Sequence, residues 1–235
     1  MASLGGPHTV TDGLVLSLDA GNTKSYQSGS TTWFDKSGFG NNGTLVNGPT
    51  FNSGSGGSIV FDGVNDYVSS SLNVNAGSNF SVFAWINPGS INVRNGIVGN
   101  SYSYSGRNGF YFSTATNYGG TLNTFFISIG NDIAYRTAAN NSITLNQWNY
   151  IGGTITNGGQ DIRLYSNGIE TAYFGGILSS GSVTYNNNEL FIGSRYSINM
   201  EVFAGSIAQV SVHNKVLTAQ EVEQNYNATK SRYNL

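Results

Sequence analysis

The chain has 235 residues, of which only 9% are charged, with no cysteine and a net charge of −2. The lack of cysteine excludes disulfides and thiolate chemistry, and the shortage of basic residues argues against nucleic-acid binding. Aromatic residues make up 13% of the chain and there are 32 glycines, which is typical of a folded β protein with many tight turns rather than of a disordered one.

Short β-rich runs follow one another along the chain, separated by Asn-Gly and other turn signals. Several of them alternate apolar and small polar residues, as half-buried strands do. FSVFAWI at 80–86 is apolar on both faces, which places it in the centre of a sheet. Many short strands joined by tight turns predict an all-β fold, a two-sheet antiparallel jelly-roll sandwich. The expected strands cover 14–20, 58–63, 80–86, 109–114, 124–130, 148–155, 162–168, 189–194 and 205–213.

One short helix is expected after the last strand. Thr218 can cap its start and Glu221, three residues later, can complete a capping box, with Leu217 and Val222 spaced for a hydrophobic staple. We find no linker long enough to separate two domains. The expected organisation is an N-terminal arm at 1–12, a single domain at 13–227 and a polar C-terminal tail at 228–235.

The stretch GGSIVFDGVNDYV at 56–68 carries two aspartates between apolar runs. The runs predict the two strands of a hairpin, with Gly63 and Asn65 in its turn. Asp62 and Asp66 are then either turn-stabilising carboxylates, which accept backbone hydrogen bonds readily, or part of a calcium site.

The ordered set GLVLSLDA, WFDKSGFGNNGTLVNGPTF, IVFDGVNDYV, FSVFAWI, WNYIGGTI, IRLYSNG, LFIGS and FAGSIAQVSVHNKVLTAQEVEQNY resembles the laminin-G-like branch of the concanavalin A-like lectin/glucanase superfamily. GPHTVTDGLVLSLDAGNTKSY and NYNATKSRYNL also resemble laminin-G-like virion proteins of tailed phages, notably marine and cyanobacterial ones. The resemblance implies an antiparallel jelly roll that binds sugars, glycoproteins or partner proteins. Some relatives bind calcium and a minority hydrolyse glycans.

The chain is expected not to be an enzyme. The superfamily's hydrolases carry a Glu-x-Asp-x-x-Glu run along one strand, and this sequence has none. Neither histidine, His8 or His213, stands beside a nucleophile-elbow motif. No catalytic residue is therefore assigned, and a glycan hydrolase is the least favoured of the functions considered.

Two binding sites are candidates. Calcium would use Asp62, Asn65 and Asp66, although Ala208 stands where the family commonly has an aspartate. Sugar binding would use aromatic faces flanked by amides and arginine, or these tyrosines are ordinary strand and loop residues. The candidate sugar-binding residues are Tyr102, Tyr104, Arg107, Asn108, Tyr118, Arg195 and Tyr196.

The N-terminus MASLGGPHTV lacks the cationic and apolar stretches of a secretory signal, and no apolar run is long enough for membrane insertion. Together with the resemblance, this favours a non-enzymatic virion surface protein (decoration, spike or tail-associated) that adheres to host glycans or receptors. Its partners would be other virion proteins and a host surface glycan. A homo-oligomer and an otherwise extracellular location stay open. The alternative is a capsid cement or tail protein that clamps neighbouring subunits, with the segment before residue 13 as a docking arm.

Overall fold

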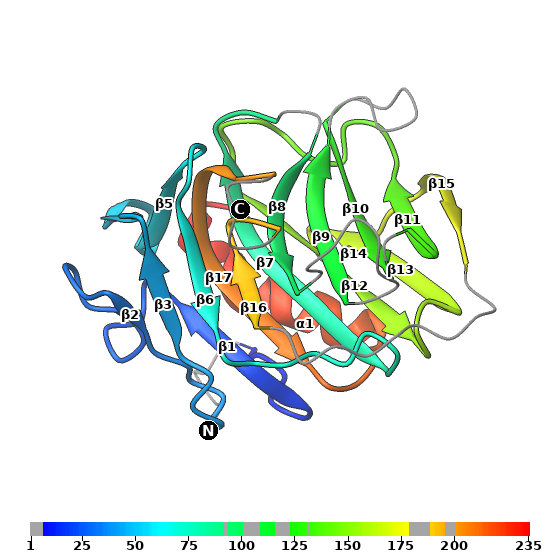
Figure 1. Ribbon diagram of the computed structural model, residues 1–235, viewed down its shortest axis with the longest axis horizontal. Coiled ribbons are helices and arrows are strands. Elements are labelled where there is room, and N and C mark those ends of the chain that lie inside the picture. The colour runs from blue at the N-terminus through cyan, green and yellow to red at the C-terminus, as the bar shows by residue number, and fades with distance from the viewer. Residues whose placement is uncertain are drawn as a thin grey trace, which may run out of the picture.

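The computed structural model describes residues 7–91, 94–100, 109–115, 123–130, 132–178, 189–195 and 201–235, and it is a sandwich of two antiparallel sheets with a helix packed on one of them (Figure 1). The two-sheet antiparallel fold with one short C-terminal helix confirms the prediction from sequence. The first sheet has the order β14 (Ile169–Glu170), β13 (Asp161–Ser166), β12 (Asn149–Thr156), β7 (Phe80–Pro88), β17 (Ala204–His213), β5 (Ser58–Asp62) and β4 (Thr50–Asn52), and β1 (Leu14–Asp19) also pairs with β17. The second sheet has the order β15 (Tyr173–Ile177), β11 (Ala134–Ala138), β10 (Thr124–Ile129), β9 (Phe110–Ala115), β8 (Asn95–Gly99), β16 (Leu190–Ile192), β6 (Tyr67–Ser70), β3 (Gly43–Val46) and β2 (Thr32–Trp33).

The main core lies between the two sheets, where alternate side chains of each strand point inward. Phe80 of β7 meets Phe110 of β9 across this layer, with ring centroids 4.8 Å apart. Strand β7 is buried on both faces along almost its whole length. Its central place, between β12 and β17, is the one that its doubly apolar sequence predicts.

The second face of β7 is buried because a helix covers it. Helix α1 (Ala219–Thr229) begins at Thr218, and the capping box with Glu221 is present in both directions. Leu217 and Val222 are both buried in one cluster with the aromatic side chains of the first sheet, as the staple pattern predicts. No helix in the described part of the chain combines the length and apolarity that a bilayer crossing requires.

Residues beyond the helix pack against the domain instead of projecting from it as the expected tail would. A 3-10 helix covers Lys230–Tyr233, and the ring of Tyr233 lies 4.1 Å from that of Trp85 and 4.8 Å from that of Trp148, between centroids. Arg232 forms an ion pair with Asp19 of β1. The C-terminal residues therefore belong to the folded unit.

The described part of the N-terminal arm also contacts its own domain. The backbone N–H of Val10 donates to Asn225 Oδ1 at 2.7 Å, and Gln224 Nε2 donates to the carbonyl of His8 at 2.7 Å. In each of these two bonds the side-chain partner, Asn225 or Gln224, belongs to helix α1. Residues 8–10 thus run beside the helix.

The segment 56–68 does not form the predicted hairpin. Strand β5 pairs with β4 and β17 in the first sheet, whereas β6 pairs with β3 and β16 in the second. The turn at 62–66 therefore carries the chain from one sheet to the other. The alternation of apolar residues identified both strands correctly, but it holds no information on their partners. Phe61 and Val68 both enter the same core, which fixes the crossing.

Candidate functional site

The predicted sugar-binding residues lie mostly outside the described part of the chain: Tyr102, Tyr104, Arg107, Asn108, Tyr118 and Tyr196. Arg195 is the member that the structure describes, and its side chain is only 1% exposed. Its Nη1 donates to Glu201 Oε1 at 3.3 Å, and its guanidinium carbon lies 4.0 Å from the centroid of the Tyr111 ring. In this arrangement Arg195 contacts the side chains of Glu201 and Tyr111, and its role in sugar binding stays a prediction.

A cluster of charged groups surrounds Arg195 on the outer face of the second sheet. Arg94 Nη1 donates to the hydroxyl of Tyr111 at 3.0 Å, and that hydroxyl donates to Asp132 Oδ1 at 2.8 Å. Arg94 also lies 3.7 Å from Glu201 Oε1 and 3.8 Å from Asp132 Oδ2. Two arginines and two carboxylates thus alternate, and their charges balance. We call these five residues (Arg94, Tyr111, Asp132, Arg195 and Glu201) the arginine–carboxylate cluster.

The chemistry of this cluster favours binding of a ligand over catalysis. Burial and the charge of Asp132 raise the pKa of Tyr111 well above its usual value, so its hydroxyl stays protonated at neutral pH. Each carboxylate has an arginine beside it, which compensates its negative charge. The accessible members are Asp132 and Arg94, whose side chains are 35% and 20% exposed. These two can offer a donor and an acceptor to a ligand that lies over the sheet.

Sequence reasoning missed Arg94, Asp132 and Glu201. One signal was available, because charged residues are rare in this chain and both Arg94 and Asp132 stand next to a predicted turn or strand. Asp132 and Glu201 also have positive φ values of 67° and 54°. Such conformations are uncommon outside glycine and concentrate at functional sites.

The candidate calcium ligands form a well-satisfied turn. Asp62 Oδ1 accepts the backbone N–H of Val64 at 2.8 Å and that of Asn65 at 3.3 Å, and Asp66 Oδ2 accepts the N–H of Asp62 at 3.0 Å. The backbone hydrogen bonds lower the pKa of Asp62, whereas burial raises the pKa of Asp66. Gly63 has φ +77°, and a Cβ there would lie 2.7 Å from that of Ala204.

These groups fit calcium poorly. The ion takes about six to eight oxygen ligands, and the turn already uses one oxygen of each carboxylate for its own backbone. Within the described ranges, no group of three or more histidine, cysteine, aspartate or glutamate side chains is placed to hold a metal ion. Calcium at Asp62, Asn65 and Asp66 stays a prediction from sequence.

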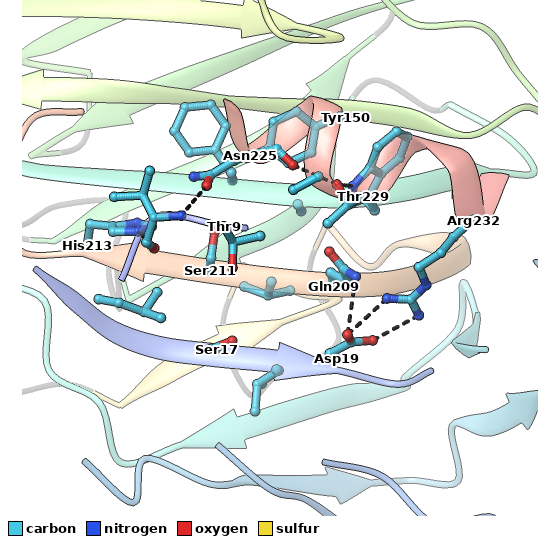
Figure 2. Close-up of a pocket in the computed structure, with 18 residues that line it drawn as sticks. Thr9, Ser17, Asp19, Tyr150, Gln209, Ser211, His213, Asn225, Thr229 and Arg232 are labelled. Carbon is cyan, nitrogen blue, oxygen red and sulfur yellow. Dashed lines mark hydrogen bonds and ion pairs between the residues drawn. The ribbon is translucent and has the colours of Figure 1, made fainter. Parts of the chain in front are cut away.

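A groove of about 270 Å³ lies on the outer face of the first sheet, beside helix α1 (Figure 2). Its floor is formed by β1 and β17, which supply Ser17, Asp19, Gln209 and Ser211. Helix α1 forms one wall. We call this the α1 groove.

The two ends of the α1 groove are closed by different groups. At one end Thr9 and Val10 of the N-terminal arm lie near His213, whose Nε2 is 3.2 Å from the carbonyl oxygen of Val10 (Figure 2). At the other end Arg232 forms two hydrogen bonds with Asp19, at 2.9 and 3.0 Å. The groove is thus bounded by segments that are far apart in the sequence.

Burial keeps His213 neutral. Its side chain is only 1% exposed, and desolvation lowers its pKa, opposed by the hydrogen bond to Val10. Its second ring nitrogen, Nδ1, is buried without a hydrogen-bond partner in the structure. His213 is the last residue of β17. Its contact with the arm could not be read from the sequence.

Two of three comparisons with known proteins found relatives of this fold. A family model described as the Concanavalin A-like lectin/glucanases superfamily matches residues 62–223. A search of curated proteins gave no match. The binding domain of Paraclostridial Mosquitocidal Protein 1 superposes with a TM-score of 0.69 at 19% identity, over 93% of this chain and 52% of that one.

Two further solved structures show the same fold. Domain 4 of AbnA, a GH43 extracellular arabinanase from Geobacillus stearothermophilus, in complex with arabinotriose, has a TM-score of 0.64 at 15% identity and covers 91% of this chain and 98% of that one. The receptor-binding domain of botulinum neurotoxin type G has a TM-score of 0.63 at 18% identity, over 92% and 51%. The chain spans about half the length of the two toxin domains. By its family match and its fold, this chain belongs to the concanavalin A-like lectin/glucanase superfamily.

Proposed function

We propose that this protein is a non-enzymatic binding module that attaches a virion to glycans or receptors on the host surface. The observation that carries the proposal is the fold shared with two toxin binding domains and with an arabinanase domain that is in complex with arabinotriose. Placement on a virion is supported by the resemblance of residues 6–26 and 225–235 to tailed-phage proteins. The arrangement of the carboxylates supports a non-catalytic role, because the described acidic pairs are already engaged by arginines or backbone N–H groups.

The arginine–carboxylate cluster is the place on the second sheet where we expect the glycan to be contacted. Arg94 supplies forked donors and Asp132 supplies acceptors, and both are partly accessible. Polar groups of this kind fix the orientation of a sugar in sites that are otherwise apolar. The neighbouring rings of Tyr111 and Phe126, 5.3 Å apart, form a rigid base beneath them.

A glycan array with the purified protein, followed by host adsorption in competition with it, tests the proposal. We expect selective glycan binding that Arg94→Ala and Asp132→Asn weaken. Glu223→Gln, on the exposed side of α1, serves as the control and keeps full binding. Absence of glycan binding, together with adsorption that the purified protein does not reduce, would overturn the proposal. Release of reducing ends from a bound glycan would contradict its non-enzymatic part.

A second candidate is a capsid cement or tail protein that clamps neighbouring subunits. It is favoured by the apolar side chains exposed in the segment 169–178, where Ile169 is 73%, Ile177 54% and Phe174 51% exposed. Exposed large apolar side chains are candidates for protein contacts, and these three lie close together in the sequence. Strand β15, which carries two of them, is an edge strand of the second sheet. Phe174→Ser should then reduce particle stability without changing glycan binding, and particles as stable as the wild type would count against the clamp.

A further inference from the structure

The outer face of the first sheet is divided into an aromatic half and a polar half. The register aligns Asp19 with Gln209, Gln209 with Trp85, and Trp85 with Tyr150 across four strands. The row beside it runs from Ser17 through Ser211 to Phe83. Helix α1 covers the aromatic half, and the polar half forms the floor of the α1 groove. Packing against the helix therefore accounts for the aromatic side chains on this face, but it does not account for the polar ones.

The polar groups of the groove have hydrogen-bonding capacity to spare. The hydroxyls of Thr9, Ser17 and Ser211 make no hydrogen bond within the described residues; Thr9 is exposed, and the two serines are half-buried. Gln209 makes one long hydrogen bond, 3.3 Å, to Asp19. The buried Nδ1 of His213 has no partner. Hydroxyl and amide groups that protein partners leave free can hydrogen-bond a polar ligand as well as water, so this lining is suited to a polar occupant.

The groove carries no unbalanced charge. Asp19 and Arg232 neutralise each other through two hydrogen bonds, and burial lowers the pKa of His213, which keeps the imidazole uncharged at neutral pH. The groups near His213 that carry charge are Lys215, Asp12 and Glu221, and Lys215 pairs with both carboxylates. A charged ligand would have no counter-charge to meet here. The groove therefore favours a neutral occupant.

The volume limits the size of the occupant. At about 270 Å³, the groove lies just below the range of roughly 300–1,000 Å³ that is typical of ligand sites. The groove is also several times larger than the volume that one water molecule occupies in the liquid, about 30 Å³. One sugar ring or a short polyol fits such a space, and an extended oligosaccharide fits only by its terminal residue.

We propose that the α1 groove binds a small neutral polyhydroxylated ligand, either a free sugar or polyol or the terminal residue of a neutral glycan. Hydroxyl groups of such a ligand can both donate to and accept from Ser17, Ser211 and Gln209. The site lies on the opposite sheet from the arginine–carboxylate cluster. It holds whether or not the proposed adhesion function is correct.

Ligand-detected NMR and calorimetry with the full chain test this proposal. The probes are neutral pyranoses, arabinose and glycerol, compared with the charged sugars sialic acid and glucuronate, and with glycans that present a neutral sugar at their end. We expect binding of at least one neutral probe and none of the charged ones. Saturation by a free sugar assigns a small-molecule ligand, and saturation only by glycans assigns the terminal-residue mode; both support the site.

Serine-to-alanine substitutions in and outside the groove locate the binding. Ser211→Ala, in the groove, should weaken binding at least threefold, and adding Ser17→Ala should weaken it further. Ser206→Ala, also in β17 but outside the groove lining, should leave it unchanged. Thermal unfolding checks that each variant is folded. Failure of all neutral probes, or binding that is equal in the Ser211 and Ser206 variants, overturns the proposal. Loss of adsorption with intact groove binding would instead refute only the adhesion function.

Discussion

Tyr233 provides a stability test in which two substitutions have opposite signs. Its ring packs between those of Trp85 and Trp148, and its side chain is 5% exposed. Its hydroxyl is buried without a hydrogen-bond partner in the structure, and burial raises its pKa, so the group stays protonated. An unsatisfied buried polar group costs about 1–3 kcal/mol. We therefore expect Tyr233→Phe to raise the free energy of unfolding by about 1 kcal/mol, because only part of that cost is recovered.

Tyr233→Ala removes the ring itself. Deletion of a buried aromatic side chain costs about 3–5 kcal/mol, and two ring contacts are lost here. In a domain of this size 1 kcal/mol shifts Tm by about 2–4 °C, so the phenylalanine variant should melt about 3 °C higher and the alanine variant about 10 °C lower. Calorimetry and urea unfolding measure both. A phenylalanine variant that is less stable, or an alanine variant as stable as the wild type, would refute the packing described for the C-terminal residues.

Substitutions at three further positions test other parts of the structure. Thr218→Ala should cost about 1 kcal/mol in urea unfolding because the capping box with Glu221 is lost, whereas Thr218→Ser should cost far less; equal losses would contradict the cap. Because the folded pKa of His213 lies below its unfolded value near 6.5, the folded state binds fewer protons, and stability should fall as pH drops below that value. His213→Asn should flatten this slope between pH 7 and 5, and an unchanged slope would contradict it. Asp66→Asn should lower Tm equally with calcium and with EDTA if the carboxylate serves the turn, and a loss seen only with calcium would assign the ion to Asp62 and Asp66.

Local features of the fold could be predicted from the sequence. The capping box of Thr218 and Glu221 was predictable because its partners are three residues apart. The central position of β7 was predictable because its own residues are apolar on both faces. The partner of β5 could not be predicted in the same way. Its pairing with β17 joins residues 58–62 to 204–207, and alternation within either run says nothing about the other.

The candidate sites were harder to predict than the fold for the same reason. Ser17 and Ser211 are ordinary strand residues until the register of β1 and β17 sets them side by side. Tyr233 follows Tyr226 by seven residues, a spacing that marks one helix face, yet the polar residues around it made the segment resemble a tail. Arg195 was expected in an open surface, and its ion pair with Glu201 depends on a tertiary arrangement that composition does not reveal.

The pairing of β17 has a consequence for how the protein is made. This strand is hydrogen-bonded to β1, β5 and β7. The strands on its two sides therefore cannot join into one sheet until residue 213 has left the ribosome. During synthesis the earlier strands expose unpaired edges and apolar faces, which are prone to aggregation. Non-local pairing of this kind also slows folding. The nascent chain is therefore expected to depend on chaperone protection until late in translation.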